Sequence, residues 1–174
     1  MNSDIDEIKP ERTPGYFPVT VIMQRRPSQV SAWADYVWTA IGITVGESAE
    51  PREESRIARI GDDTLLQFYS GYQVHLYVDE CDSYYHNLMS PSPHCFVVVR
   101  QDNDTDRPEP FLVTLSFDEA HAYLEGDDSV YAVDIPPELY RWTENFVLEH
   151  YCPQRIKKRK RKNWRDSDKE RPAV

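Results

Sequence analysis

The first half of the chain consists of short apolar runs that are separated by turn residues. In residues 72–78, Val74, Leu76 and Val78 alternate with polar or aromatic positions, which is the period-2 pattern of a strand with one buried face. The other runs are rich in β-branched residues over the length of a strand. Together they predict strands over residues 17–24, 38–45, 56–60, 64–69 and 72–78. We expect the last three of these strands, over residues 56–78, to form an antiparallel meander.

Residues 28–45 carry two competing patterns. Val30, Trp33, Val37 and Ile41 fall at helical spacing, whereas residues 38–45 have the composition of a strand. We interpret this stretch as a strand that follows a loop or a helical turn. The alternative, in which a helix continues through residues 28–40, stays open.

The second half contains a weak internal repeat. Residues 74–80 followed by Tyr84 align with residues 113–119 followed by Tyr123 at a constant offset of 39 positions. Each copy is a strand that runs into an acidic helix start, and Ser116 and Glu119 have the spacing of a capping box. Each helix is followed by a further strand, over residues 95–100 and 129–135. The repeat predicts two strand–helix–strand units that form a small mixed sheet with the helices on one face.

The last apolar pattern predicts a C-terminal helix. It opens with Pro136 and Pro137 and repeats apolar positions at helical spacing before Pro153. Leu139, Trp142 and Phe146 lie on the face that we expect to dock on the body. The predicted class is therefore α+β, with an antiparallel meander, two strand–helix–strand units and this final helix.

Length and charge divide the chain into three parts. Its 174 residues fit one domain, which we assign to residues 17–152, with a disordered lead over residues 1–16 and a basic disordered tail over residues 153–174. The tail has ten basic and three acidic residues, a net charge of +7, whereas residues 1–152 carry −17. The chain is thus an acidic body with a basic tail.

Secretion, a membrane span and a disulfide framework are not expected. The start of the chain is acidic and has no apolar leader segment, and the run at residues 96–99 is far shorter than the roughly 20 residues of a membrane span. Cys81, Cys95 and Cys152 are an odd number at wide spacing, which fits reduced thiols. These features predict a cytoplasmic protein.

Signatures of catalysis and of cofactor binding are missing from the sequence. The five histidines lack metal-ligand spacing, and the six glycines form no phosphate-binding loop. In the pair His94 and Cys95, neighbouring strand residues point to opposite faces, so we expect a buried thiol rather than a nucleophile. We assign no catalytic residue, no metal site and no cofactor.

The basic tail is the candidate partner-binding site. A tryptophan near a cluster of cations offers an anchor for contact with another protein, and the acidic body would repel a polyanion. The tail can also neutralise its own body; we rank self-association or a protein partner above nucleic acid. The assigned residues are Arg155, Lys157, Lys158, Arg159, Lys160, Arg161, Lys162 and Trp164.

With these residues in place, the chain resembles a proteobacterial family known only as domain of unknown function 3305. The resemblance spans roughly residues 17–162. It rests on Arg25-Arg26, Trp33, Trp38, Gly71, Tyr85-His86-Asn87-Leu88, the strand from Phe96 to Arg100, Asp118-Glu119-Ala120 with Tyr123, Ile135-Pro136-Pro137-Glu138-Leu139, Trp142, Phe146-Val147, Glu149-His150 and Lys158-Arg159-Lys160-Arg161.

The genes of this family commonly neighbour those of molybdenum-dependent formate dehydrogenases. The resemblance therefore implies a non-enzymatic accessory or maturation protein that binds a formate dehydrogenase subunit or another maturation factor. The alternative is an enzyme or carrier that acts on the molybdenum cofactor in the molybdopterin-guanine dinucleotide pathway. A concave basic pocket would favour the alternative, because that cofactor carries phosphates.

Overall fold

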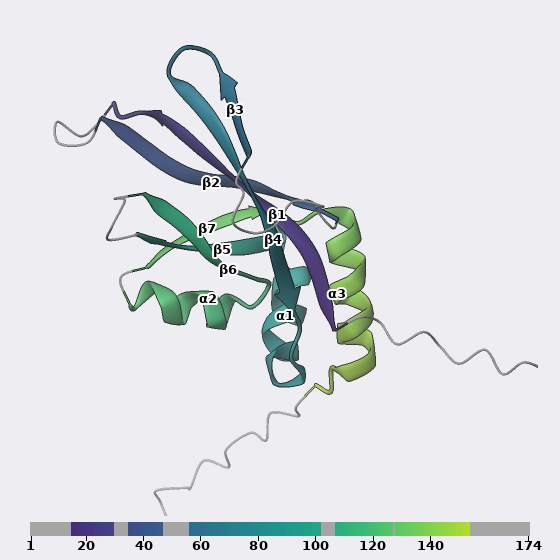
Figure 1. Ribbon diagram of the computed structural model, residues 1–174. Helices are drawn as coiled ribbons and strands as arrows, with labels where there is room; N and C mark the ends of the chain where they lie inside the picture. The colour runs from purple at the N-terminus through teal and green to yellow at the C-terminus, as the bar shows by residue number, and fades with distance from the viewer. Residues whose placement is uncertain (1–14, 30–34, 47–55, 102–106, 127, 154–174) are drawn as a thin grey trace, which may run out of the picture.

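A computed structural model of the chain places seven strands, three α-helices and one short 3-10 helix in the residues that it describes (Figure 1). The described residues are 15–29, 35–46, 56–101, 107–126 and 128–153. They form an α+β fold with two antiparallel sheets, which confirms the predicted class. Most of the predicted lead and almost all of the predicted tail lie outside them.

The first sheet has four strands, and its order differs from a meander. The strands are β1 (Tyr16–Pro27), β2 (Tyr36–Val45), β3 (Arg56–Ile60) and β4 (Thr64–His75). Their order is β2-β1-β4-β3, so β1 lies in the interior of the sheet and pairs with both β2 and β4. All pairings are antiparallel, as expected. The competing patterns before residue 45 resolve as a strand from Tyr36 onward.

One of the predicted chain breaks is wrong: residues 64–75 form a single strand across Ser70 and Gly71. Val19 pairs with Tyr72 and Val21 with Tyr69, so two residues of β4 stand opposite one residue of β1. Gly71 has a φ of 79°, a left-handed conformation that glycine adopts without strain. The glycine therefore marks a bulge inside β4 rather than a turn between two strands.

The second sheet is antiparallel, whereas the repeat predicted a mixed sheet. Its strands are β5 (His94–Gln101), β6 (Pro108–Thr114) and β7 (Ser129–Asp134), in the order β6-β5-β7. β6 and β7 run parallel to each other, but β5 lies between them and pairs antiparallel with both. β6 and β7 are joined through the helix that follows β6, but β5 lies between them in the sheet. The connection is therefore a split β–α–β unit, in which the two parallel strands are not hydrogen-bonded to each other.

The helices are α1 (Cys81–Leu88), α2 (Phe117–Leu124) and α3 (Pro137–His150), with a 3-10 turn at Val78–Glu80 before α1. α2 packs on the three-stranded sheet, while α1 lies against α2 and α3. None of these helices combines the length and the apolar content that crossing a membrane requires. The predicted helix starts are confirmed to within two residues.

The capping box at the start of α2 is only half formed. Ser116 caps the helix, since its Oγ accepts a hydrogen bond from the backbone N–H of Glu119 at 3.1 Å. The Glu119 carboxylate accepts a hydrogen bond from the Thr114 hydroxyl instead of returning to Ser116. Thr114 thus takes over the second half of the motif, and its hydroxyl oxygen also accepts the N–H of Ser116.

The two copies of the repeat do not occupy equivalent places, so the predicted packing on one side of one sheet is wrong. The strand of the first copy, β4, belongs to the four-stranded sheet, whereas the strand of the second copy, β6, belongs to the three-stranded sheet. Tyr84 is fully buried in the main core, but Tyr123 packs against Phe111 outside it. Pairing with β1 over its whole length keeps β4 out of the second sheet.

The core lies between the two sheets and extends under α1 and α3. β2 contacts β7 and β4 contacts β6, so the sheets face each other. α3 docks through Leu139 and Trp142, which are buried, and through the half-buried Phe146. The Trp142 ring lies 5.3 Å from the ring of Phe17 on β1. The predicted face of the last helix is confirmed.

Candidate functional site

The residues that the sequence assigned to partner binding, from Arg155 to Trp164, lie outside the described residues. The structure does place the point where this basic segment (residues 153–174) begins. Tyr151, just beyond α3, stacks on Tyr85 of α1 with ring centroids 4.4 Å apart. Cys152 and Pro153 follow on the surface. The basic segment therefore begins at the end of the molecule where α1 and α3 meet.

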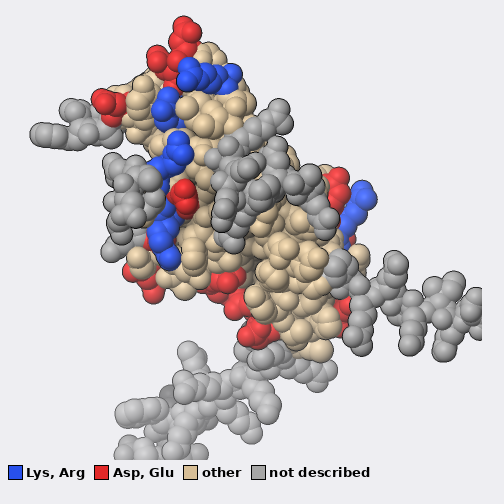
Figure 2. Space-filling view, viewed as in Figure 1, with Lys and Arg blue, Asp and Glu red and all other residues tan. Residues whose placement is uncertain are grey.

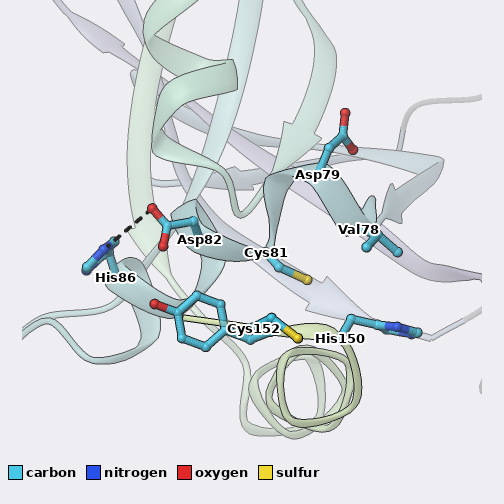
Figure 3. Close-up of a pocket in the computed structure, with 8 residues that line it drawn as sticks. Val78, Asp79, Cys81, Asp82, His86, His150 and Cys152 are labelled. Atoms are coloured by element: carbon cyan, nitrogen blue, oxygen red, sulfur yellow. Dashed lines mark ion pairs between the residues drawn. The ribbon is translucent and has the colours of Figure 1, made fainter. Parts of the chain in front are cut away.

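A pocket of about 650 Å³ lies at the same place (Figure 3). We call it the helix-end pocket, because the start of α1 lines one side of it and the end of α3 the other. It brings together acidic groups, thiols and histidines that are up to 73 positions apart in the chain, from Asp79 to Cys152. Its lining residues are Val78, Asp79, Cys81, Asp82, His86, His150, Tyr151 and Cys152.

The helix-end pocket has two aspartates and neither lysine nor arginine among the described residues that line it. Asp82 and His86 are one helical turn apart on the exposed face of α1, with Oδ2 and Nε2 separated by 3.7 Å. This pocket suits a cationic group better than a phosphate. No group of three or more His, Cys, Asp or Glu side chains in the described residues is arranged to hold a metal ion.

The three thiols differ in exposure. Burial is the main factor that raises the pKa of the Cys81 thiol, and the neighbouring Asp79 carboxylate adds to it. Burial raises the pKa of Cys95 to about 12, and its Sγ lies 3.6 Å from the carbonyl oxygen of Thr114. The prediction that Cys95 is buried is confirmed. Cys152 is exposed at the rim of the helix-end pocket.

His86 and Asn87 are neighbours on α1 and have different surroundings. His86 separates the helix-end pocket from a second pocket of about 430 Å³, which Phe96 and Phe117 line on its apolar side. Asn87 donates hydrogen bonds to the carbonyl oxygens of His94 and Leu115, and its side-chain oxygen accepts the backbone N–H of His94. Asn87 therefore ties α1 to the start of β5 and to the chain after β6.

A second surface of interest lies at the end of the sheets away from α3. Arg25 on β1 pairs in register with Trp38 on β2, and its guanidinium lies 4.1 Å from the ring centroid of Tyr36. Arg107, just before β6, lies 5.7 Å from the ring centroid of Trp38 and acts electrostatically on Tyr69. Guanidinium groups and aromatic rings thus alternate along this surface. We call these five residues the arginine–aromatic ladder.

The ladder lies on the face of the four-stranded sheet that looks toward the three-stranded sheet. Val21 and Met23 are buried on that face, and Arg25 continues the same alternation along β1. Tyr69 pairs with Val21 and is 5% exposed, yet its hydroxyl has no hydrogen-bond partner among the described residues. Burial, partly offset by the charge of Arg107, raises the pKa of Tyr69 to about 12.

Sequence analysis did not find either surface. The ladder residues come from β1, β2, β4 and the chain before β6, and the helix-end pocket joins two helices that are far apart in the chain. Arg25 and Trp38 appear among the residues that carry the family resemblance, which is the one signal that pointed to the ladder. Strand pairing alone brings the remaining positions together.

The fold and these two surfaces define a small α+β protein of two antiparallel sheets, with an acidic helix end and an arginine-rich sheet end. The chain belongs to the family described as "Protein of unknown function (DUF3305)", whose model matches residues 18–162. Comparisons with curated proteins and with solved structures gave no significant match.

Proposed function

We propose that this chain is a non-catalytic accessory protein that binds an acidic partner protein through its basic segment. The main observation behind the proposal is the position at which the chain leaves the folded body after α3. The stacking of Tyr151 on Tyr85 fixes the last turn of the chain to α1, and Cys152 and Pro153 then lie exposed. Ten basic residues and Trp164 follow from a fixed point on the surface.

The proposed partner is a subunit of a molybdenum-dependent formate dehydrogenase or one of its maturation factors. This part of the proposal rests on the gene neighbourhood that the family resemblance implies, and it places the protein in the cytoplasm of a proteobacterium. Charge on the basic segment would speed the encounter, and Trp164 would supply an apolar contact that excludes water. Arg155, Lys157, Lys158, Arg159, Lys160, Arg161 and Lys162 supply that charge.

The alternative function, an enzyme or carrier that acts on the molybdenum cofactor, requires a concave site for phosphate groups. The helix-end pocket has the opposite character in the part of the chain that the structure describes, because Asp79 and Asp82 line it there without a lysine or an arginine. Its acidic walls would repel a phosphorylated pterin. This pocket therefore supports the binding protein over the cofactor enzyme.

Affinity purification from native cells, followed by mass spectrometry, tests the proposal. The test variant replaces Lys157, Lys158, Lys160 and Lys162 by glutamine, and a matched control replaces Lys169 by glutamine in the same segment. We expect the test variant to lose a formate dehydrogenase component that the wild type and the control retain. Recovery should also fall as the salt concentration rises, because exposed charges are screened.

Two results would contradict the proposal. Equal recovery of the same component by the test variant would show that the basic segment does not recruit the partner. Tight, salt-sensitive binding of the wild type to random DNA would instead assign the segment to nucleic acid. A melting temperature equal to that of the wild type confirms that the test variant keeps its folded body.

A further inference from the structure

Two buried donor atoms in the arginine–aromatic ladder have no hydrogen-bond partner in the part of the chain that the structure describes. One is the Nε of Arg25 and the other is the hydroxyl of Tyr69. A buried donor without a partner costs about 1–3 kcal/mol, so native proteins rarely retain one without a reason such as a bound group. Tyr69 is buried and Arg25 is half-buried, so of these two side chains only that of Arg25 reaches the surface.

The two arginines of the ladder lie near aromatic rings with the flat faces of their guanidinium groups. The N–H groups at the edges of these planes stay available for other contacts. The guanidinium of Arg25 lies over Tyr36 and that of Arg107 lies near Trp38. A guanidinium that stacks on a ring still presents its N–H groups in the plane, where they match a carboxylate in a two-bond geometry. The rings also hold the arginines in place, which lowers the entropy that a ligand must remove.

Charge gathers at this end of the molecule. In Figure 2 most of the arginine side chains of the described residues that this view shows form a column along one side, and acidic side chains lie beside it. Among the ion pairs that the described residues form with one another, only Arg100 with Asp128 joins an arginine to a carboxylate. An acidic ligand therefore finds complementary charge here, although the body as a whole is negative.

We propose that the arginine–aromatic ladder is the docking site for an extended, carboxylate-rich segment of a partner protein. Arginine, tryptophan and tyrosine are the residues that most often dominate binding energy at protein interfaces. The exposed or half-buried members of the ladder come from β1, β2 and the chain before β6, so they offer successive contacts to an extended chain rather than one contact to a single ion. Glu109 lies near Tyr69, so the ligand carboxylates lie nearer to Arg25 and Arg107.

The inference rests on the proposed function only in taking the partner to be an acidic protein, and it assigns the contact to the folded body rather than to the basic segment. Fluorescence anisotropy of a fluorescein-labelled oligo-glutamate peptide, titrated with the full chain, tests it. We expect R25Q and R107Q each to raise the Kd about tenfold. Y69F should change the Kd less than about twofold, because the buried Tyr69 hydroxyl lies out of reach of the peptide.

The matched control is R26Q, because Arg26 is the exposed neighbour of Arg25 and points to the other face of β1. It removes the same charge, and we expect it to change the Kd less than about twofold. A second readout is the fluorescence of Trp38, which should change when the peptide binds to the wild type but not to R107Q. Equal weakening by R26Q and R107Q would overturn the inference.

The lysine-to-glutamine variant of the basic segment separates this inference from the proposed function. If only that variant loses the peptide, the ladder is not the docking site and the proposed function stands. If only R25Q and R107Q lose it, the ladder is the site and the basic segment does not bind acidic chains. Tighter binding of guanosine monophosphate than of the peptide, lost in the same variants, would assign the ladder to phosphate ligands and overturn the inference.

Discussion

Two tyrosines on β4 have the same orientation but opposite hydrogen-bonding states. Tyr69 and Tyr72 are three positions apart, a spacing that places side chains on opposite faces of a regular strand. The bulge at Ser70 and Gly71 adds one residue, so both rings point into the core. The Tyr72 hydroxyl donates a hydrogen bond to the carbonyl oxygen of Pro110 at 2.5 Å, whereas no described residue bonds to the Tyr69 hydroxyl.

This difference predicts opposite effects of the same substitution. Y69F should leave the free energy of unfolding unchanged or raise it by about 1 kcal/mol, because it removes an unpaired buried group. Y72F should lower it by about 1 kcal/mol or more, because the carbonyl of Pro110 loses its donor. Chemical denaturation of the three proteins checks both values. Equal destabilisation by the two substitutions would mean that the Tyr69 hydroxyl has a partner in solution.

The raised pKa of Tyr69 adds a pH dependence with a definite sign. The folded protein holds this proton up to a pH of about 12, while the unfolded chain releases it near pH 10. The contribution is fully present below pH 10 and is lost as the pH rises toward 12. Y69F has no such group to titrate. Denaturation curves at increasing pH should therefore show the free energy of unfolding of the wild type falling relative to that of Y69F. A constant difference across this range would contradict the assignment.

Thiol reactivity should follow exposure. Cys152 is exposed, whereas Cys81 and Cys95 are buried, and burial raises the pKa of both buried thiols. We therefore expect one fast-reacting thiol per native chain with a thiol reagent, and all three after denaturation. C152S should remove the fast phase, and the control C95S should keep it. A fast phase that survives in C152S would show that the helix-end pocket opens to expose Cys81.

Among the elements, α3 contributes the clearest docking contact. Trp142 is 8% exposed and packs on Phe17, which lies near the start of β1. W142A should lower the free energy of unfolding by about 3–5 kcal/mol, because it leaves a large cavity under the helix. L148A is the matched control, since Leu148 on the same helix is 77% exposed and should change stability by less than about 0.5 kcal/mol. Thermal melts compare the two variants with the wild type. A W142A variant that melts within a degree or two of the wild type would show that the Trp142 face of α3 is exposed to solvent.

At the scale of the whole molecule, the two sheets are joined across one core. The Tyr131 hydroxyl on β7 donates a hydrogen bond to the carbonyl oxygen of Trp38 on β2 at 3.1 Å, and Tyr72 makes the corresponding link from β4 to β6. Buried residues from both sheets, α1 and α3 form one continuous cluster. Neither sheet has a core of its own that would support it alone.

We therefore expect a single cooperative unfolding transition. Circular dichroism, which follows the sheets and helices, and tryptophan fluorescence, which follows Trp38 and Trp142, should give the same midpoint. The coincidence should persist in W142A at a lower temperature. Two separate midpoints would show that the sheets unfold independently, and the helix-end pocket and the ladder would then belong to separate folding units.

The sequence by itself determined the elements whose signals are local. Residues 56–60 and the starts of β5 and β7 follow from β-branched composition, and α3 follows from apolar spacing between Pro137 and His150. The class of the fold and the buried state of Cys95 follow from the same patterns. Each of these depends on residues that are close together in the chain, so the pattern contains the necessary information.

The tertiary structure alone decided which strands pair and which side chains meet. The placement of β1 between β2 and β4 turned two predicted strands into one, and the placement of β5 between β6 and β7 removed the mixed sheet. The same pairings created the arginine–aromatic ladder, while the docking of α3 beside α1 created the helix-end pocket. These contacts join residues that are tens of positions apart in the chain. The arrangement that buries the most apolar surface in a shared core selects them, and a local pattern of side chains does not specify that arrangement.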